Sequence, residues 1–245
     1  MKRRFFVPRD LISDRDVALP PDSAHRARNV LRLRDGDAVE LFDGSGASFT
    51  GTLQMRGREV RARDLKPVPQ TAVPRPDLAL AVALIKPARF EWMLEKATEL
   101  GVDEFIPLVT RHTEFHGSEP DPGARMLRWL RIVRQACEQC GRSTVPAIRK
   151  PLAFRDFITL EEFSGFTRLL CCEKAGTARR MEVKAGPSVI CIGPEGGWDQ
   201  EEIETSIRAG YRPVSLGENI LRVETAALAA VILVRSTDWG FLVAD

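Results

Sequence analysis

The sequence lacks several features that mark specialised classes of protein. None of its apolar runs approaches the roughly 20 residues that a membrane-spanning helix needs. Its first residues, MKRRFFVPRD, lack the apolar stretch of a secretory signal peptide. Its five cysteines are an odd number in a chain of 245 residues, which argues against a disulfide framework and fits a reducing compartment. We therefore expect a cytoplasmic globular protein.

A strong excess of charge of one sign is also absent, since the net charge is only +2. The charge is nevertheless unevenly distributed. Residues 1–66 carry fourteen Lys and Arg against ten Asp and Glu, and residues 125–142 carry five Arg against one Glu. Such local basic patches are compatible with a nucleic-acid partner but do not establish one.

A proline-rich segment, residues 67–77, predicts a semi-rigid linker between two domains. The smaller domain, residues 1–66, has a mostly β pattern. Two expected strands, Val39–Phe42 and Ser48–Met55, flank the turn sequence DGSG at 43–46. With a further strand at Arg58–Leu65 and a short helix at Pro21–Leu33, this pattern predicts a small β-barrel of the kind that often binds nucleic acids.

The larger domain, residues 78–245, alternates strands and helices. Leu78–Ile85 and Val102–Val109 read as strands, and Arg89–Leu100 reads as an amphipathic helix between them. This alternation predicts an α/β fold with a parallel sheet and helices on both faces. A further helix is expected from Asp121-Pro122 to about Cys140. On a helical wheel its basic residues lie opposite an apolar side made of Met126, Leu127, Trp129, Leu130, Val133, Ala136, Cys137 and Cys140.

Two strand-to-helix junctions near the C-terminus carry the most information. The strand Ser188–Ile192 leads into a loop with three glycines, and Asp199 with Glu202 has the spacing of a capping box for the next helix. The strand Arg212–Leu216 leads into a second loop, before a helix that starts at about Glu224. Two ordinary turns would be the simpler interpretation. Because open α/β sheets bind ligands at the carboxyl ends of their strands, the tandem junctions predict a cofactor pocket.

Several motifs in a fixed order extend this prediction. They are MKRRFFV at the start, His25 followed by NVLRL at 29–33, DGSG at 43–46, FEWMLEKATELG at 90–101, ACEQCGR at 136–142, IGPEGGW at 192–198 and LGENILRVETAALAA at 216–230. In this order the chain resembles a family of the SPOUT superfamily, whose members methylate N3 of a uridine in 16S ribosomal RNA of the small ribosomal subunit. The chain departs from the family's usual pattern at Glu218-Asn219, where a basic residue is common.

The resemblance implies a C-terminal domain with a trefoil knot that holds S-adenosylmethionine, and an N-terminal PUA-like barrel that helps to hold the RNA. It also implies a homodimer. Within the pocket, apolar side chains are expected to pack against the adenine. Backbone N–H and C=O groups are expected to form hydrogen bonds with the ribose and methionine parts. The expected cofactor-binding residues are Leu170, Cys171, Cys172, Glu173, Ile192, Gly193, Pro194, Glu195, Gly196, Gly197, Leu216, Gly217, Ile220, Leu221, Arg222, Thr225 and Ala226.

Methylation at N3 of a uridine requires loss of a weakly acidic proton, so a base or a cation at the uracil carbonyls would help. Glu195 is the candidate base and Arg222 the candidate cation, although Arg222 could instead pair with Glu195 or Glu224 to fix the loop. The candidate RNA-binding residues are Arg3, Arg4, His25, Arg28, Arg32, Arg131, Arg134 and Arg142.

Three other functions remain open. The chain could methylate a different RNA, or it could be a non-catalytic RNA-binding factor in ribosome assembly. A zinc nucleobase deaminase is suggested by His112-Thr113-Glu114 with Cys137 and Cys140, but position 136 is Ala where that signature has Pro. His112 and His116 lie in an expected loop, so no metal site is predicted.

Overall fold

The structure is a computed structural model that describes residues 3–12, 15–57, 59–69, 77–114, 121–172, 179–181 and 185–238. It divides into two compact units, one made of residues 1–74 and 134–145 and the other of residues 75–133 and 146–245. Residues 134–145, which the predicted boundaries place in the larger domain, thus group with the first unit. No helix in the described ranges is long and apolar enough to cross a membrane.

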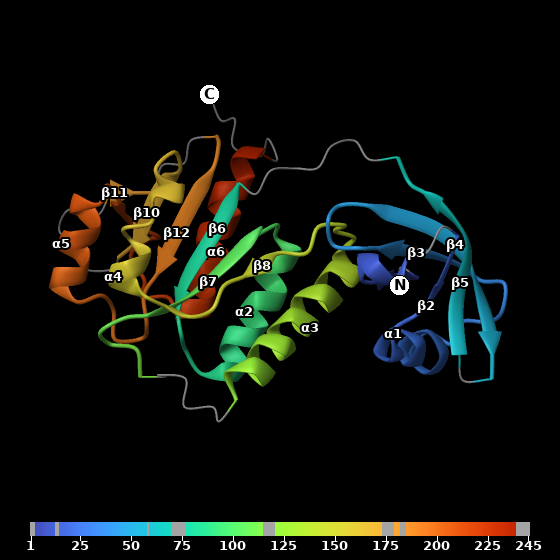
Figure 1. Cartoon of the computed structure of the whole chain (residues 1–245). Helices are drawn as coiled ribbons and strands as arrows, with labels where there is room; N and C mark the ends of the chain where they lie inside the picture. Colours follow the sequence, from blue (N-terminus) through green and yellow to red (C-terminus); the bar gives the residue numbers. More distant parts are fainter. Residues whose placement is uncertain are drawn as a thin grey trace. The chain divides into compact units, whose positions relative to one another are not determined.

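The first unit is built on a five-stranded mixed sheet (Figure 1). Its strand order is β1-β3-β4-β5-β2, with β1 parallel to β3 and the other neighbours antiparallel. The predicted turn at 43–46 is confirmed between β3 and β4, where the Asp43 carboxylate accepts hydrogen bonds from the backbone and hydroxyl of Ser45. The strands are β1 (Arg4–Phe6), β2 (Asp16–Ala18), β3 (Ala38–Phe42), β4 (Ser48–Arg56) and β5 (Glu59–Pro67).

The expected single helix over Pro21–Leu33 is wrong. The chain forms α1 (Pro21–His25) and then a wider, π-helical turn over Arg26–Val30, in which the N–H of Leu31 donates to the carbonyl of Arg26. Arg32 has a positive φ of 52°, which an α-helix does not tolerate. The helical path therefore ends before Arg32, because that residue turns the chain away.

The second unit contains the predicted parallel sheet, which is confirmed. The strand order is β11-β13-β10-β12-β6-β7-β8, β9 also pairs with β7, and every pair is parallel. β10 lies between β12 and β13, so the carboxyl ends of these three strands are neighbours. The strands are β6 (Leu78–Ala83), β7 (Glu104–Val109), β8 (Ala147–Ile148), β9 (Leu152–Ala153), β10 (Thr167–Cys171), β11 (Arg179–Arg180), β12 (Ser188–Ile192) and β13 (Arg212–Ser215).

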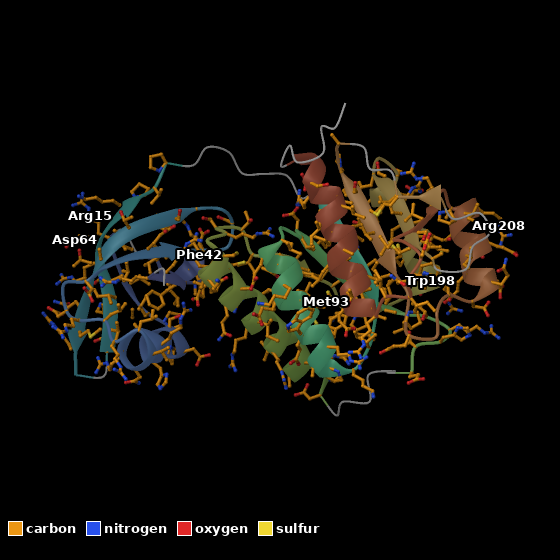
Figure 2. The ribbon with its side chains drawn as sticks, turned by 180° about the vertical axis from the view of Figure 1, so that it is seen from behind. Arg15, Phe42, Asp64, Met93, Trp198 and Arg208 are labelled. Atoms are coloured by element: carbon orange, nitrogen blue, oxygen red, sulfur yellow. The ribbon has the colours of Figure 1, made fainter. Side chains whose placement is uncertain are left out.

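Helices cover both faces of this sheet, as predicted. Ala79 and Ala81 pack in one buried cluster with Phe154 of α4, and the alternate residues of β6 therefore point to the opposite face. There, α6 contacts β6 and β12 and packs against α2, whose Met93 is fully buried (Figure 2). The helices are α2 (Pro87–Glu99), α4 (Phe154–Phe157), α5 (Gln200–Arg208) and α6 (Val223–Asp238).

The helix α3 (Pro122–Cys140) contributes residues to both units. Asp121 caps it as predicted, because its carboxylate accepts hydrogen bonds from the N–H groups of the next turn. The predicted apolar side is correct for Trp129 and Val133, which are buried, but wrong for Leu127, which is 70% exposed. Leu127 lies two residues before Trp129, about half a turn around the helix, so its side chain points away from the buried side.

Burial keeps several thiols of the protein protonated. It raises the pKa of Cys137 and of Cys172 to about 12, and it raises the pKa of Cys171 and Cys191 as well. Because the thiolate is the reactive form, these thiols are poor nucleophiles at neutral pH.

Cys140 and Cys171 are the two half-buried thiols, and the raised pKa of Cys171 disfavours its reactive thiolate. We therefore expect a thiol reagent such as Ellman's reagent to modify the native protein mainly at Cys140, and all five cysteines after denaturation. The Cys140→Ser variant should therefore react very slowly while folded. Rapid modification of several thiols in that folded variant would contradict the raised thiol pKa of Cys137, Cys171, Cys172 and Cys191.

Candidate functional site

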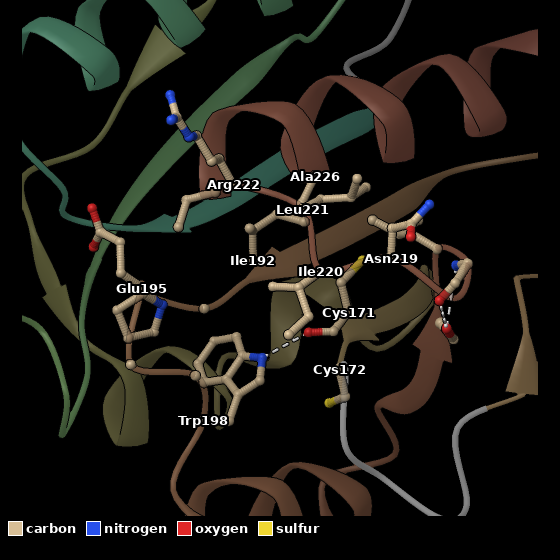
Figure 3. A pocket seen from close by; sticks show the side chains of 18 of the residues that line it. Cys171, Cys172, Ile192, Glu195, Trp198, Asn219, Ile220, Leu221, Arg222 and Ala226 are labelled. Carbon is tan, nitrogen blue, oxygen red and sulfur yellow. Dashed lines mark hydrogen bonds between the residues drawn. The ribbon is translucent and has the colours of Figure 1, made fainter.

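A cavity of about 520 Å³ lies at the carboxyl ends of β10, β12 and β13, where the two predicted junctions meet (Figure 3). This volume is in the range of small-molecule and cofactor sites. The wall is formed by Cys171, Cys172, Ile192, Gly193, Pro194, Glu195, Gly196, Gly197, Trp198, Ile203, Ser215, Leu216, Gly217, Glu218, Asn219, Ile220, Leu221, Arg222, Val223 and Ala226.

The first junction is held in place by Trp198. Its indole Nε1 donates a hydrogen bond of 2.8 Å to the carbonyl oxygen of Cys171, which ties the loop after β12 to the end of β10 (Figure 3). The ring also lies against Gly193, where a Cβ atom would approach the Trp198 ring to 3.0 Å. Glycine at 193 therefore permits the close approach that this wall of the pocket requires.

The second junction presents apolar side chains to the same cavity. The Ser215 hydroxyl donates to the carbonyl of Gly217, whose φ of 135° favours glycine, and the loop then turns into α6. Ile220 is 78% exposed, and Figure 3 shows it extending toward Trp198 and Cys171. An isoleucine so exposed, beside a tryptophan, forms a surface that a flat apolar ligand can cover.

Four charged residues lie at or beside one edge of the cavity. Arg222 and Glu195 are both at least partly exposed, and Figure 3 shows their charged ends directed away from Trp198. The sequence leaves open an ion pair of Arg222 with Glu195 or Glu224. Within the described residues both carboxylates instead lie near Arg89 of α2, at 3.8 Å from Glu195 and 3.9 Å from Glu224, and Arg222 has no ion pair.

The two cysteines of the cavity wall act as neutral lining. Burial raises the pKa of both Cys171 and Cys172, so neither supplies a thiolate nucleophile at neutral pH. The chemistry that the cavity can perform thus depends on its backbone groups and on the charged edge.

The structure places most of the expected cofactor-binding residues on the cavity wall. Leu170 is fully buried in β10 and Thr225 is exposed on α6, and neither contributes to the lining. Glu173 lies outside the described residues, as does His116. Residues of the wall that were not predicted are Trp198, Ile203, Ser215, Glu218, Asn219 and Val223. Trp198 ends the IGPEGGW motif, so the motif itself could have indicated it.

The candidate RNA-binding residues differ in how accessible they are. His25, Arg32 and Arg131 are exposed, and Arg3 is half-exposed in an ion pair with Asp37. Arg4 requires a correction because it is only 1% exposed, which leaves no surface for a phosphate contact. Its guanidinium pairs with Glu40 and packs over the ring of Phe42, so it serves the core of the first unit.

The remaining three candidates are half-buried. Arg28 donates to the carbonyls of Gly57 and Glu59, and Arg142 donates to the Thr144 hydroxyl at 3.4 Å. Arg134 packs over the Phe6 ring, and burial lowers its pKa. Only part of each guanidinium group is therefore accessible to an RNA phosphate.

No group of three or more metal-ligating side chains occurs in the part of the chain that the structure describes. The thiol of Cys137 is buried and near the carbonyl of Thr144. This arrangement gives no support to the zinc deaminase alternative.

Comparison with known proteins identifies the family of the chain. A family model described as an RNA methyltransferase domain matches residues 73–235, and one described as an RNA methyltransferase PUA domain matches residues 19–60, which confirms the PUA-like assignment. The ribosomal RNA small subunit methyltransferase E of Synechocystis is 34% identical over 237 residues, covering 94% of this chain and 76% of its own. The Rickettsia conorii protein of that name is 29% identical over 242 residues, covering 95% and 94%.

A similar fold is known from a crystal structure. The ribosomal RNA small subunit methyltransferase E of Neisseria gonorrhoeae, bound to S-adenosyl methionine, is 31% identical and covers 98% of each chain with a TM-score of 0.82. Matches of this length and identity establish the family. The chain therefore belongs to the ribosomal RNA small subunit methyltransferase E family.

Proposed function

We propose that this protein transfers a methyl group from S-adenosylmethionine to N3 of a uridine in 16S ribosomal RNA of the small ribosomal subunit. The observation that carries the proposal is the cavity at the ends of β10, β12 and β13, with one apolar wall and one charged edge. The similarity to ribosomal RNA methyltransferases supports the same conclusion.

The residues of the cavity fit S-adenosylmethionine. Exposed Ile220 can cover one face of the adenine, and the glycine-rich backbone from Gly193 to Gly197 can hydrogen-bond the polar parts of the molecule. The packing is close at Gly193, because a Cβ atom there would lie 3.0 Å from the Trp198 ring and the ring would have to shift. When bound, the cofactor supplies an electrophilic methyl group on a sulfonium, so the protein's tasks are to orient the acceptor and to exclude water.

The charged edge suits a uridine as the acceptor. Uridine N3 carries a proton at neutral pH, and the Glu195 carboxylate is the group assigned to accept it. The electron pair of that N–H bond stays on N3 and forms the bond to the methyl carbon, while the carbon–sulfur bond breaks and its pair stays on sulfur. Arg222 stabilises the negative charge that develops on a uracil carbonyl oxygen.

The exposed candidates for RNA binding are His25 and Arg32 in the first unit and, separately, Arg131 in the second. Because phosphate contacts release counterions, RNA affinity should fall as salt rises. We also propose a homodimer, as the resemblance implies.

The direct test is transfer of tritiated methyl groups from S-adenosylmethionine to small ribosomal subunits that lack the modification, followed by mass spectrometry of the nucleosides. Label in 3-methyluridine of 16S RNA is the expected result. Cofactor binding without transfer would favour a different RNA as substrate. Absence of both binding and transfer would favour a non-catalytic RNA-binding factor.

Replacement of the candidate base should slow the chemical step. We expect Glu195→Gln to lower kcat by roughly a hundredfold, a typical contribution of general base catalysis, with little change in cofactor affinity. The matched control is Glu201→Gln, an exposed carboxylate in the first turn of α5 that does not line the cavity. A Glu195→Gln enzyme with wild-type kcat would remove Glu195 from the mechanism.

Crowding at Gly193 should weaken cofactor binding. We expect Gly193→Ala to raise the Kd for S-adenosylmethionine by about tenfold, because its Cβ would force the Trp198 ring to shift within the cavity wall. Calorimetry can measure this change. Gly165→Ala, where a Cβ meets no atom within 4 Å, is the control that should bind normally. Equal affinities of the two variants would place the cofactor elsewhere.

A further inference from the structure

Arg89 is a charged residue beside the cavity that the proposed function leaves unassigned. It lies in the first turn of α2, outside both junctions. Its Nη1 is 3.8 Å from Oε1 of Glu195, in the loop after β12, and its Nε is 3.9 Å from Oε1 of Glu224, in the first turn of α6. One guanidinium thus links two segments that approach the cavity from different strands.

The Glu224 carboxylate is buried, and Arg89 provides a positive charge near it. The residue is only 8% exposed, and its Oε2 is buried with no hydrogen-bond partner among the described residues. A buried carboxylate is unfavourable unless a positive charge compensates it. The N-terminus of α6 contributes part of that compensation, and Arg89 is the ion-pair partner that the structure shows.

Arg89 also restricts the orientation of the Glu195 side chain. Two glycines follow it, so the loop offers few side chains to restrict its rotamers, and its carboxylate is partly exposed. At 3.8 Å the contact is longer than a hydrogen bond. Arg89 can therefore attract the carboxylate toward the cavity edge and still leave its lone pairs available to accept a proton.

We propose that Arg89 is a positioning residue for methyl transfer, which holds the Glu195 carboxylate at the cavity edge and compensates the buried charge of Glu224. This inference rests on the proposed function, in which Glu195 accepts the N3 proton of the uridine. With Arg89 in place, the proton acceptor is fixed, and the negative charge of Glu224 is screened from the charge that develops on the uracil.

The test compares Arg89→Met and Arg89→Lys with Arg149→Met. Arg149 is a matched control because it also bridges two carboxylates, Glu104 and Glu162, and none of the three lines the cavity. We expect Arg89→Met to lower kcat roughly tenfold to a hundredfold, because a small displacement of the Glu195 carboxylate slows the chemical step. The KM for RNA and the Kd for S-adenosylmethionine should change little. Arg89→Lys should restore much of kcat, and Arg149→Met should lower only the stability to urea.

A double-mutant cycle distinguishes positioning from general stabilisation. If Arg89 acts through Glu195, Arg89→Met should reduce kcat much less in the Glu195→Gln background than in the wild type. If Arg89→Met does not fold, the Arg89→Met/Glu224→Gln variant removes the uncompensated buried charge and takes its place in the comparison.

Three results would overturn the inference and leave the proposed function intact. They are wild-type kcat in Arg89→Met, an equal loss in both backgrounds, and an equal loss of kcat in Arg149→Met. Failure of the wild-type protein to form 3-methyluridine would instead refute the proposed function, and this inference with it.

Discussion

The parallel pairing of β10 with both β12 and β13 is the constraint on which the site depends. Residues Leu170 and Cys171 pair with Cys191 and Ile192 on one side and with Pro213 and Val214 on the other. Since all three strands run in the same direction, their loops emerge together at one edge of the sheet. The Trp198–Cys171 hydrogen bond then ties two of these loops to each other and forms one wall of the cavity.

The cavity combines two environments that methyl transfer requires. Its apolar side, with Ile220 and Trp198, can shield a flat ring such as adenine from water. Its charged edge can accept a proton from the acceptor base. The charges at that edge come from three segments: the loop after β12, the start of α6 and the start of α2. Glu224 is buried, so the compensation of its charge that we propose for Arg89 connects the stability of this edge to its chemistry.

Much of this arrangement could be predicted from the sequence. Alternating strands and helices indicated the parallel sheet, and the IGPEGGW and LGENILR segments indicated the cavity because glycines and apolar residues follow strands there. The exceptions have simple geometric causes. Leu170 lies one residue before the carboxyl end of β10 and is fully buried in the core of the sheet, whereas Cys171 and Cys172 reach the cavity, and Arg4 on β1 points into a core rather than to solvent.

Other features could not be read from the sequence. Arg89 meets Glu195 and Glu224 only through tertiary packing, since it lies far from both in the chain. The helical path ends before Arg32 because that residue has a positive φ, which no propensity would indicate for an arginine. The trefoil knot stays a prediction, because residue patterns do not encode the threading of a chain.

The most direct test of this account is a crystal structure of the protein with S-adenosylmethionine. We predict that the cofactor occupies the cavity between the ends of β10, β12 and β13, with its adenine against Ile220 and its methyl group facing the edge that carries Glu195 and Arg222. A cofactor bound outside this cavity, or a methyl group directed away from that edge, would contradict the account.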